Sequence, residues 1–99
     1  MAVKTTDPGV SAARRAARKA MKGQDPAARV QVQHGSGEHI HVMVVSDTFA
    51  GRSMADRNDV VWPELRALPL DVLLRISLVM LLTPEEHDDL VQSQRLVAA

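Results

Sequence analysis

Three histidines lie close together in the sequence and are the residues best suited to bind a metal. They are His34, His39 and His41, with Glu38 beside them as a carboxylate. Neutral imidazole is a good ligand for iron or zinc. The chain has no cysteine, which excludes disulfides, thiolate nucleophiles and Cys-ligated zinc. We therefore expect any metal site to use these histidines; the alternative is that they are exposed polar positions.

Catalytic patterns are missing from the sequence. There is no serine, histidine and aspartate in an order typical of hydrolases, and no pair of carboxylates placed for acid-base chemistry. The glycines of Gly35-Ser36-Gly37 form too short a loop to bind phosphate, and they precede a predicted strand rather than a helix. We expect a protein that is not an enzyme and has no catalytic residues.

Charge is divided unevenly along a chain whose formal net charge is zero. Residues up to Val30 carry seven cations and two carboxylates, a net charge of +5, and the remainder carries five cations and ten carboxylates, −5. A basic first helix with Arg52, Arg57 and Arg66 could contact nucleic-acid phosphates. The alternative is a solvated basic helix face. Only Phe49 and Trp62 are aromatic, so the chain lacks a platform for stacked bases.

The first half of the chain predicts a helix followed by a hairpin. Asp7-Pro8 is typical of a helix start, and the helix should end near Lys22, before Gly23. Alternating polar and apolar residues predict strands at residues 29–33 and 39–45, joined by Gly35-Ser36-Gly37. The alternation places one set of side chains toward the core, and His39 and His41 on the other face. The expected core-side residues are Val30, Val32, Ile40, Val42 and Val44.

The second half predicts helices, a strand and a last helix. Ser53 is a suitable cap for a short helix through Arg57, and a further helix should reach about Leu68. Pro63 should break that segment into two pieces or delay its start, because proline in a helix removes a hydrogen bond and clashes with the preceding turn. The apolar run from Val72 to about Leu82 suits a strand that is buried on both faces or at the centre of the sheet.

A capping box begins the last predicted helix. Thr83 is the cap, Pro84 takes the first helical position and Glu86 the third. The predicted order is therefore αββααβα, a small single α+β domain with a three-stranded mixed sheet and helices packed on one face. We expect residues 7–92 to form the domain, with flexible termini at 1–6 and 93–99.

Length and hydropathy argue against a membrane protein. The longest apolar stretch, from Leu68 to Leu82, is interrupted by Pro69, Asp71 and Arg75, and it is shorter than the roughly 20 apolar residues that a spanning helix needs. The chain has 99 residues, which fits one compact core. We expect a cytoplasmic protein that is a monomer or a weak homodimer, since an exposed sheet edge can pair with a second copy.

An ordered set of short motifs resembles the BolA family. The predicted second strand ends in Val45-Ser46-Asp47, then come Phe49, Gly51 and Arg57, an apolar helix, an apolar strand and the Thr-Pro-Glu-Glu helix start. The match runs from His39 to Leu90. The family motif residues are thus Ser46, Asp47, Phe49, Gly51 and Arg57. The first four also have structural roles of their own, as strand-ending hydrogen-bonding groups, a core ring and a glycine with positive φ.

The resemblance implies a non-enzymatic adaptor with a fold similar to type II KH modules. Such proteins pair with monothiol glutaredoxins, share a 2Fe-2S cluster in iron homeostasis and bind no cofactor alone; some are transcriptional regulators, which keeps a KH-like nucleic-acid-binding function as the alternative. His39 matches the cluster ligand of the hairpin. The second ligand, a histidine at the start of the last strand, is replaced by Arg75, or by Leu74 if one residue is inserted. We therefore expect that a shared cluster is not held in the usual way.

Overall fold

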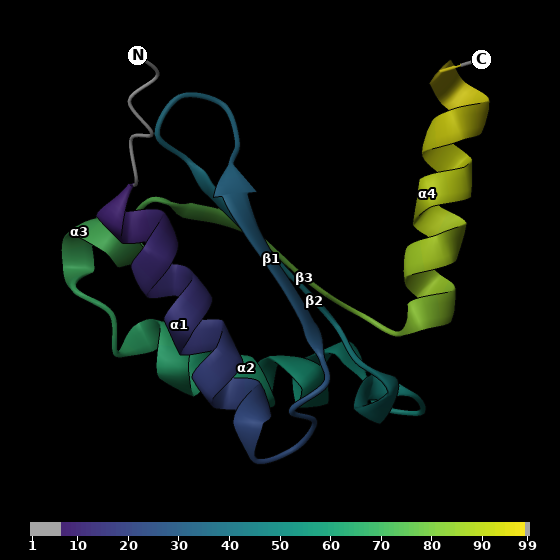
Figure 1. Cartoon of the computed structure of the whole chain (residues 1–99), viewed down its shortest axis with the longest axis horizontal. Helices are drawn as coiled ribbons and strands as arrows, with labels where there is room; N and C mark the ends of the chain where they lie inside the picture. Colours follow the sequence, from purple (N-terminus) through teal and green to yellow (C-terminus); the bar gives the residue numbers. More distant parts are fainter. Residues whose placement is uncertain (1–6, 99) are drawn as a thin grey trace.

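The computed structural model describes residues 7–98, which form one α+β domain in the predicted order αββααβα (Figure 1). The predicted N-terminal segment 1–6 lies outside the described residues. The elements are α1 (Pro8–Lys22), β1 (Arg29–His34), β2 (Ile40–Val45), the short 3-10 helix η1 (Asp47–Phe49), α2 (Met54–Arg66), α3 (Leu70–Leu73), β3 (Ile76–Leu82) and α4 (Pro84–Ala98).

The sheet is mixed and three-stranded, as predicted, with strand order β1-β2-β3. β1 and β2 form the antiparallel hairpin, and β3 runs parallel to β2. The expectation that the last strand lies at the sheet centre or is buried on both faces is wrong, because β2 takes the central position and β3 is an edge strand. Of the β3 side chains only Leu81 is fully buried, and Leu78 is 40% exposed. The apolar run does not distinguish a central strand from an edge strand.

Helices α1 and α2 cover one face of the sheet and enclose the core (Figure 1). The predicted inward side chains of the hairpin do face these helices: Val32, Ile40, Val42 and Val44 are buried, and Val30 packs against them partly buried. From α1 the core receives small residues and one long one, since Ala13, Ala17 and Met21 are buried. The small side chains of Ala13 and Ala17 let α1 approach the sheet closely.

Helix α2 is continuous from Met54 to Arg66 and contains Pro63, so the predicted break or late start is wrong. Val61 and Leu65 lie on either side of the proline and are completely buried. Burying two such side chains stabilises the fold by about 1.5–3 kcal/mol each, which offsets the roughly 3 kcal/mol cost of an internal proline. Pro63 itself is exposed, so its ring displaces no core side chain.

The segment before β3 is helical rather than extended. The sequence predicts a strand from Val72, but Leu70–Leu73 form α3 and the strand begins at Ile76. Backbone hydrogen bonds from Leu73 N to Pro69 O and from Leu74 N to Leu70 O close this turn, at 3.0 and 2.9 Å. The two helices predicted over residues 53–68 are therefore the single helix α2. The second helix before β3 is α3, in a segment that was predicted partly as strand.

Helix α4 begins with the predicted capping box, in which Glu86 N donates to Thr83 Oγ1 and Thr83 N donates to Glu86 Oε1. It does not join α1 and α2 on their face of the sheet (Figure 1). His87 instead lines a small cavity with Arg29, Gln31 and Met43, which point away from the core. The expectation of helices on one face therefore holds for α1 and α2 but not for α4.

Helical structure continues to Ala98, into the 93–99 segment that the sequence analysis places outside the domain. No helix in the described part of the chain combines the length and the apolar character that crossing a membrane requires.

Candidate functional site

The hairpin loop presents His39 to solvent. Gly35 N donates to His39 O at 2.9 Å, and His39 N donates to Ser36 O at 3.2 Å. Gly37 has a φ of 62°, which glycine adopts without strain. These backbone bonds close the loop and leave the His39 side chain exposed to solvent.

Arg75, at the start of β3, is bound to the N-terminus of α1. Its Nη1 and Nη2 donate to the two carboxylate oxygens of Asp7 at 3.1 and 2.5 Å. Its Nε donates to Glu38 O in the hairpin loop at 2.8 Å. This bidentate pair lowers the pKa of Asp7 well below its usual range, mainly through the Arg75 hydrogen bond, and raises the pKa of Arg75. Arg75 thus joins α1, the hairpin and β3.

Asp7 also binds one of the candidate metal ligands. His34 Nε2 lies 2.6 Å from Asp7 Oδ2, and Asp7 Oδ1 accepts a hydrogen bond from Gly9 N at 2.8 Å as the cap of α1. The Asp7-Pro8 pattern predicts the helix cap, but the cluster of Asp7, His34 and Arg75 was not predicted from the sequence. No local pattern could reveal it, because Arg75 is 68 residues from Asp7.

His41 lies on the opposite side of the sheet from the core. Its ring occupies the space where a side chain at Gly35 would begin, so a substituent at Gly35 would displace the ring. His41 also lines a shallow hollow of about 60 Å³ with Met43, Leu78 and Met80. This half-buried ring therefore has its own surroundings, separate from those of His34.

The structure does not bring the three histidines together. In residues 7–98 no group of three or more histidine, cysteine, aspartate or glutamate side chains is placed to hold a metal ion. His34 binds Asp7, His41 packs against Gly35, and His39 is exposed. A site that needs two donors, at the hairpin and at the start of β3, is not matched here, because the guanidinium of Arg75 is a cation without a lone pair to give.

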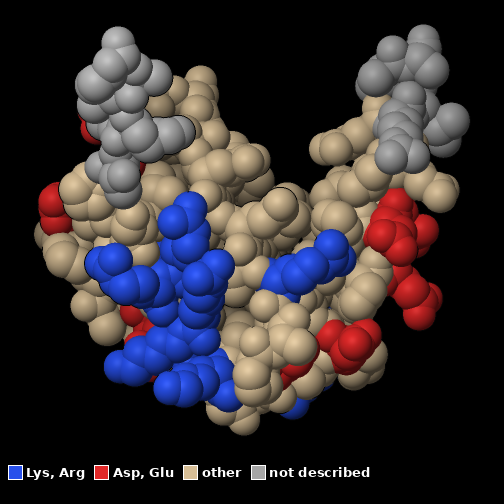
Figure 2. Space-filling model, in the orientation of Figure 1, with Lys and Arg blue, Asp and Glu red and all other residues tan. Residues whose placement is uncertain are grey.

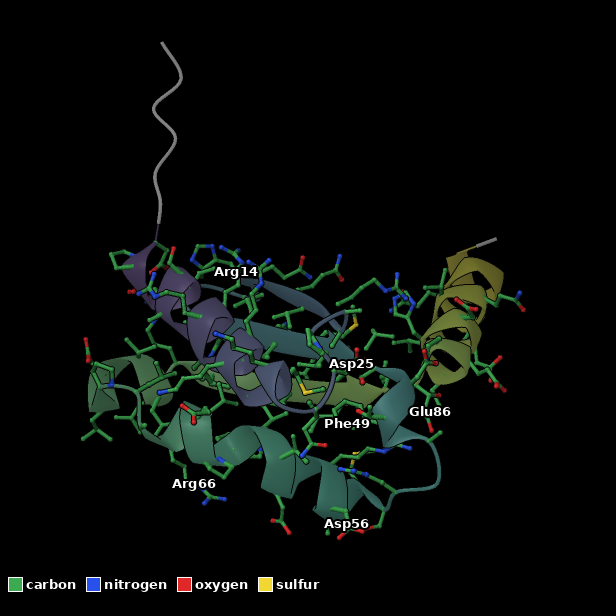
Figure 3. The ribbon with its side chains drawn as sticks, turned by 60° about the horizontal axis from the view of Figure 1, so that its bottom comes forward. Arg14, Asp25, Phe49, Asp56, Arg66 and Glu86 are labelled. Carbon is green, nitrogen blue, oxygen red and sulfur yellow. The ribbon has the colours of Figure 1, made fainter. Side chains whose placement is uncertain are left out.

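The motif residues at the end of β2 stabilise the fold. Ser46 is buried, and its Oγ donates to Asp25 Oδ2 at 2.7 Å and accepts from Thr48 N at 3.1 Å. Phe49 is completely buried (Figure 3), and Gly51 has the expected positive φ, 76°. Asp47 is exposed and begins η1. The predicted roles of Ser46, Phe49 and Gly51 are confirmed, but no hydrogen bond of the Asp47 side chain is present in the described part of the chain. The contribution of Asp25 was not predicted.

Arg57 is buried, and its guanidinium makes four hydrogen bonds within the protein. Its Nη1 donates to Leu81 O at 2.9 Å and to Glu86 Oε1 at 2.6 Å, Nη2 donates to Glu86 Oε2 at 3.1 Å, and Nε donates to Arg52 O at 3.1 Å. Its guanidinium carbon lies 5.8 Å from the centre of the Phe49 ring, within cation-π range. Hydrogen bonds from Arg57 and then from the Thr83 amide lower the pKa of Glu86 to about 2.

This burial removes Arg57 from the predicted nucleic-acid contacts, because its donors are already used inside the protein. The two remaining residues lie at opposite ends of α2: Arg52 precedes its cap, Ser53, and Arg66 is in its last turn. Arg66 points away from the sheet (Figure 3). The cations of α1 form a separate patch (Figure 2). The structure therefore does not gather Arg52, Arg57 and Arg66 into one phosphate-binding surface.

The chain is similar in fold to a protein of known structure. No protein-family model and no curated protein matches the chain. Among solved structures, BolA1 from Arabidopsis thaliana is similar, with a TM-score of 0.50 and 19% sequence identity. The similarity covers 82% of this chain and 98% of the plant protein. At this identity the comparison bears on the fold.

Proposed function

We propose that this chain, which has a BolA-like fold, is a non-enzymatic cytoplasmic adaptor that binds a monothiol glutaredoxin in iron homeostasis. The observation that supports the proposal is the fold itself, combined with an exposed His39 in the hairpin loop, to which the family resemblance assigns the place of a cluster ligand. The buried position of Arg57 weighs against the nucleic-acid alternative.

The adaptor makes this contact without the usual cluster ligation. A bridging 2Fe-2S cluster needs four donors, of which the glutaredoxin and its glutathione supply two. Of the two donors that this protein must supply, the exposed His39 could be one. The place of the other donor, at the start of β3, is taken by Arg75, which is bound to Asp7. The positive charge of Arg75 beside the cluster would also repel the positively charged iron ions and so disfavour cluster binding. We therefore expect a contact that is cluster-free or carries only a labile cluster.

Two measurements test this function. Isothermal titration of the chain with an apo monothiol glutaredoxin should show binding, and no detectable binding would refute the proposed partnership. Anaerobic mixing of both proteins with iron and sulfide, followed by visible absorption and circular dichroism, should show no stable heterodimeric cluster. A stable cluster that is lost in His39→Ala would mean that another histidine replaces the second donor. A stable cluster that survives removal of His34, His39 and His41 in turn would refute the site assignment.

A gain-of-function variant sharpens the test. Arg75→His places a second imidazole at the start of β3, and we expect it to form a heterodimeric cluster that persists longer than that of the wild type. Arg75→Gln is the matched control, because it also loses the Asp7 ion pair but cannot ligate iron well. If Arg75→His and Arg75→Gln behave alike, the second ligand position has been placed incorrectly.

A further inference from the structure

Two helices of this protein carry exposed ridges of opposite charge. The basic ridge of α1 consists of Arg15, Arg18, Lys19 and Lys22, all exposed. The acidic ridge of α4 consists of Glu85, Asp88 and Asp89, also exposed. Residues three, four and seven positions apart share one helix face, so the basic ridge extends over about two turns and the acidic ridge over about one.

The charges of both ridges are largely unused within the molecule. Of the basic ridge only Lys19 makes an ion pair among the described residues, at 3.7 Å to Glu64, and its side chain remains 74% exposed. Of the acidic ridge, within the described part of the chain, only Asp88 lies near a basic side chain, with its carboxylate 3.9 Å from the imidazole Nδ1 of His87, and the Asp88 side chain is 77% exposed. Both ridges can therefore accept partners from outside the chain.

The basic ridge borders a hollow in the surface of the protein. This hollow has a volume of about 420 Å³, and Met21, Ala28 and Val30 contribute apolar surface to it. Asp25 also lines the hollow, but one of its carboxylate oxygens accepts from Ser46. The surface thus consists of four cations around an apolar depression. An anionic segment large enough to cover the depression would fit this surface.

The acidic ridge of a second copy has the position and direction to fit this surface. Cations gather over α1 on one side of the face shown in Figure 2, and carboxylates gather over the beginning of α4 on the other side. In the same view α1 runs downwards and α4 upwards (Figure 1). A rotation by half a turn about a vertical axis in front of this face exchanges left and right and preserves up and down. It therefore sets each basic ridge against an acidic ridge, with the two helices antiparallel.

Helix dipoles add to the match. The basic ridge occupies the second half of α1 and the acidic ridge occupies the first turns of α4, so each set of charges suits its own helix end. Antiparallel pairing also places the C-terminal end of one helix beside the N-terminal end of the other. The zero net charge of the chain leaves no overall repulsion between copies.

We propose that this protein forms a two-fold symmetric homodimer in which the basic ridge of α1 binds the acidic ridge of α4 from a second copy. The two contacts are identical by symmetry, so the assembly closes at two copies. Each contact consists of exposed ion pairs, which are individually weak, and the dimer is accordingly weak and sensitive to salt. The proposal is independent of the glutaredoxin partnership.

Sedimentation equilibrium over a range of protein concentrations tests the dimer. Fits at about 10 mM and about 1 M salt, where the Debye length is about 30 Å and about 3 Å, should show a monomer-dimer equilibrium at low salt that shifts to monomer at high salt. A dimer with the same dissociation constant in both, a monomer at every concentration at low salt, or growth beyond two copies would each overturn the proposal.

A charge exchange identifies the surfaces. Arg18→Glu and Asp88→Lys should each weaken self-association by about tenfold or more, because both contacts then oppose like charges. Mixing the two variants should restore dimers, since the two introduced charges, which are opposite in sign, then face each other in one contact and the other contact keeps its original residues. Arg66→Glu, on the exposed surface of α2, is the matched control and should leave the dimer unchanged.

Circular dichroism of each variant establishes that it is folded, and Arg15→Glu replaces Arg18→Glu if that variant is not. Restoration in the mixture supports the pairing of these two ridges. Two variants that stay monomeric together, or a loss of dimer in Arg66→Glu equal to that in Arg18→Glu, would refute it.

Discussion

Arg57 and Arg75 each join parts of the molecule that lie far apart in the chain. Arg57 binds the carboxylate of Glu86 and the Leu81 carbonyl, and Arg75 binds the carboxylate of Asp7 and the Glu38 carbonyl. In both cases a bidentate carboxylate pair is completed by a backbone oxygen, which satisfies several of the guanidinium donors. One arginine fixes the start of α4 and the other fixes the start of α1.

The Glu86 carboxylate should make stability depend on pH. Its pKa in the folded protein is about 2, below the ordinary value of 4.5. A carboxyl with a lowered pKa stabilises the folded state above its unfolded pKa, and this contribution disappears as the pH falls through the folded pKa. Urea unfolding at a series of pH values should therefore show a smaller acid-induced loss of stability between about pH 5 and about pH 2 in Glu86→Gln than in the wild type.

Glu85→Gln is the control for this variant, because Glu85 is the exposed neighbour of Glu86 in the first turn of α4. It should retain the acid sensitivity of the wild type. If the free energy of unfolding falls equally with pH in Glu86→Gln and in the wild type, the ion pair with Arg57 does not contribute to acid unfolding.

Among the elements, α2 shows how core burial can override a local signal. Its interior proline predicts a break, yet buried Val61 and Leu65 hold the helix on the core as one piece. The helix must therefore tolerate a backbone carbonyl one turn before Pro63 that receives no hydrogen bond from the proline nitrogen. A substitution of Pro63 can restore this missing hydrogen bond.

Replacing that proline should stabilise the protein. Pro63→Ala restores a backbone donor and a residue with high helix propensity, and it should raise the free energy of unfolding by about 1–3 kcal/mol. Pro8→Ala is the control: Pro8 is at the first helical position of α1, where proline is well tolerated, so the change should be small. Urea denaturation measures both. Equal effects of the two variants, or destabilisation by Pro63→Ala, would contradict this account.

The whole molecule is unevenly packed. The central strand β2 contributes Ile40, Val42 and Val44 to the core between the sheet and the two helices α1 and α2. Helix α4 projects from the end of β3 on the other side of the sheet (Figure 1). Helix α4 contacts the rest of the protein through its first turn, where Glu86 binds Arg57 and His87 lines a small cavity against the sheet.

This arrangement predicts a gradient of hydrogen-exchange protection. At high salt, where the proposed dimer is dissociated, amides of β2 should exchange slowest and amides of α4 beyond Leu90 should exchange faster than those of α1 and α2. Exchange through local opening follows the free energy of that opening, and the outer turns of α4 can open without exposing the core. Mass spectrometry of peptic fragments measures this, and equal protection of α4 and α2 would contradict it.

The sequence by itself determined the elements whose signals are local. The Asp7-Pro8 cap, the alternation in the hairpin and the Thr83 to Glu86 capping box each involve neighbouring residues, and each appears as predicted. Gly51 likewise has the positive φ that its place in the motif suggested. Such features depend on backbone geometry and on hydrogen bonds within a few residues, so the order of residues is sufficient to predict them.

Only the tertiary structure decided how distant residues combine. The edge position of β3, the place of α4 and the continuity of α2 depend on which surfaces pack together. The candidate site shows the same limit: the three histidines are close in sequence but separate in space, whereas Asp7 and Arg75 are distant in sequence and bonded. Neighbouring residues of a strand point to opposite faces of the sheet, and a long guanidinium side chain can reach a distant element. The fold therefore decides which side chains meet, and closeness along the chain does not reveal these contacts.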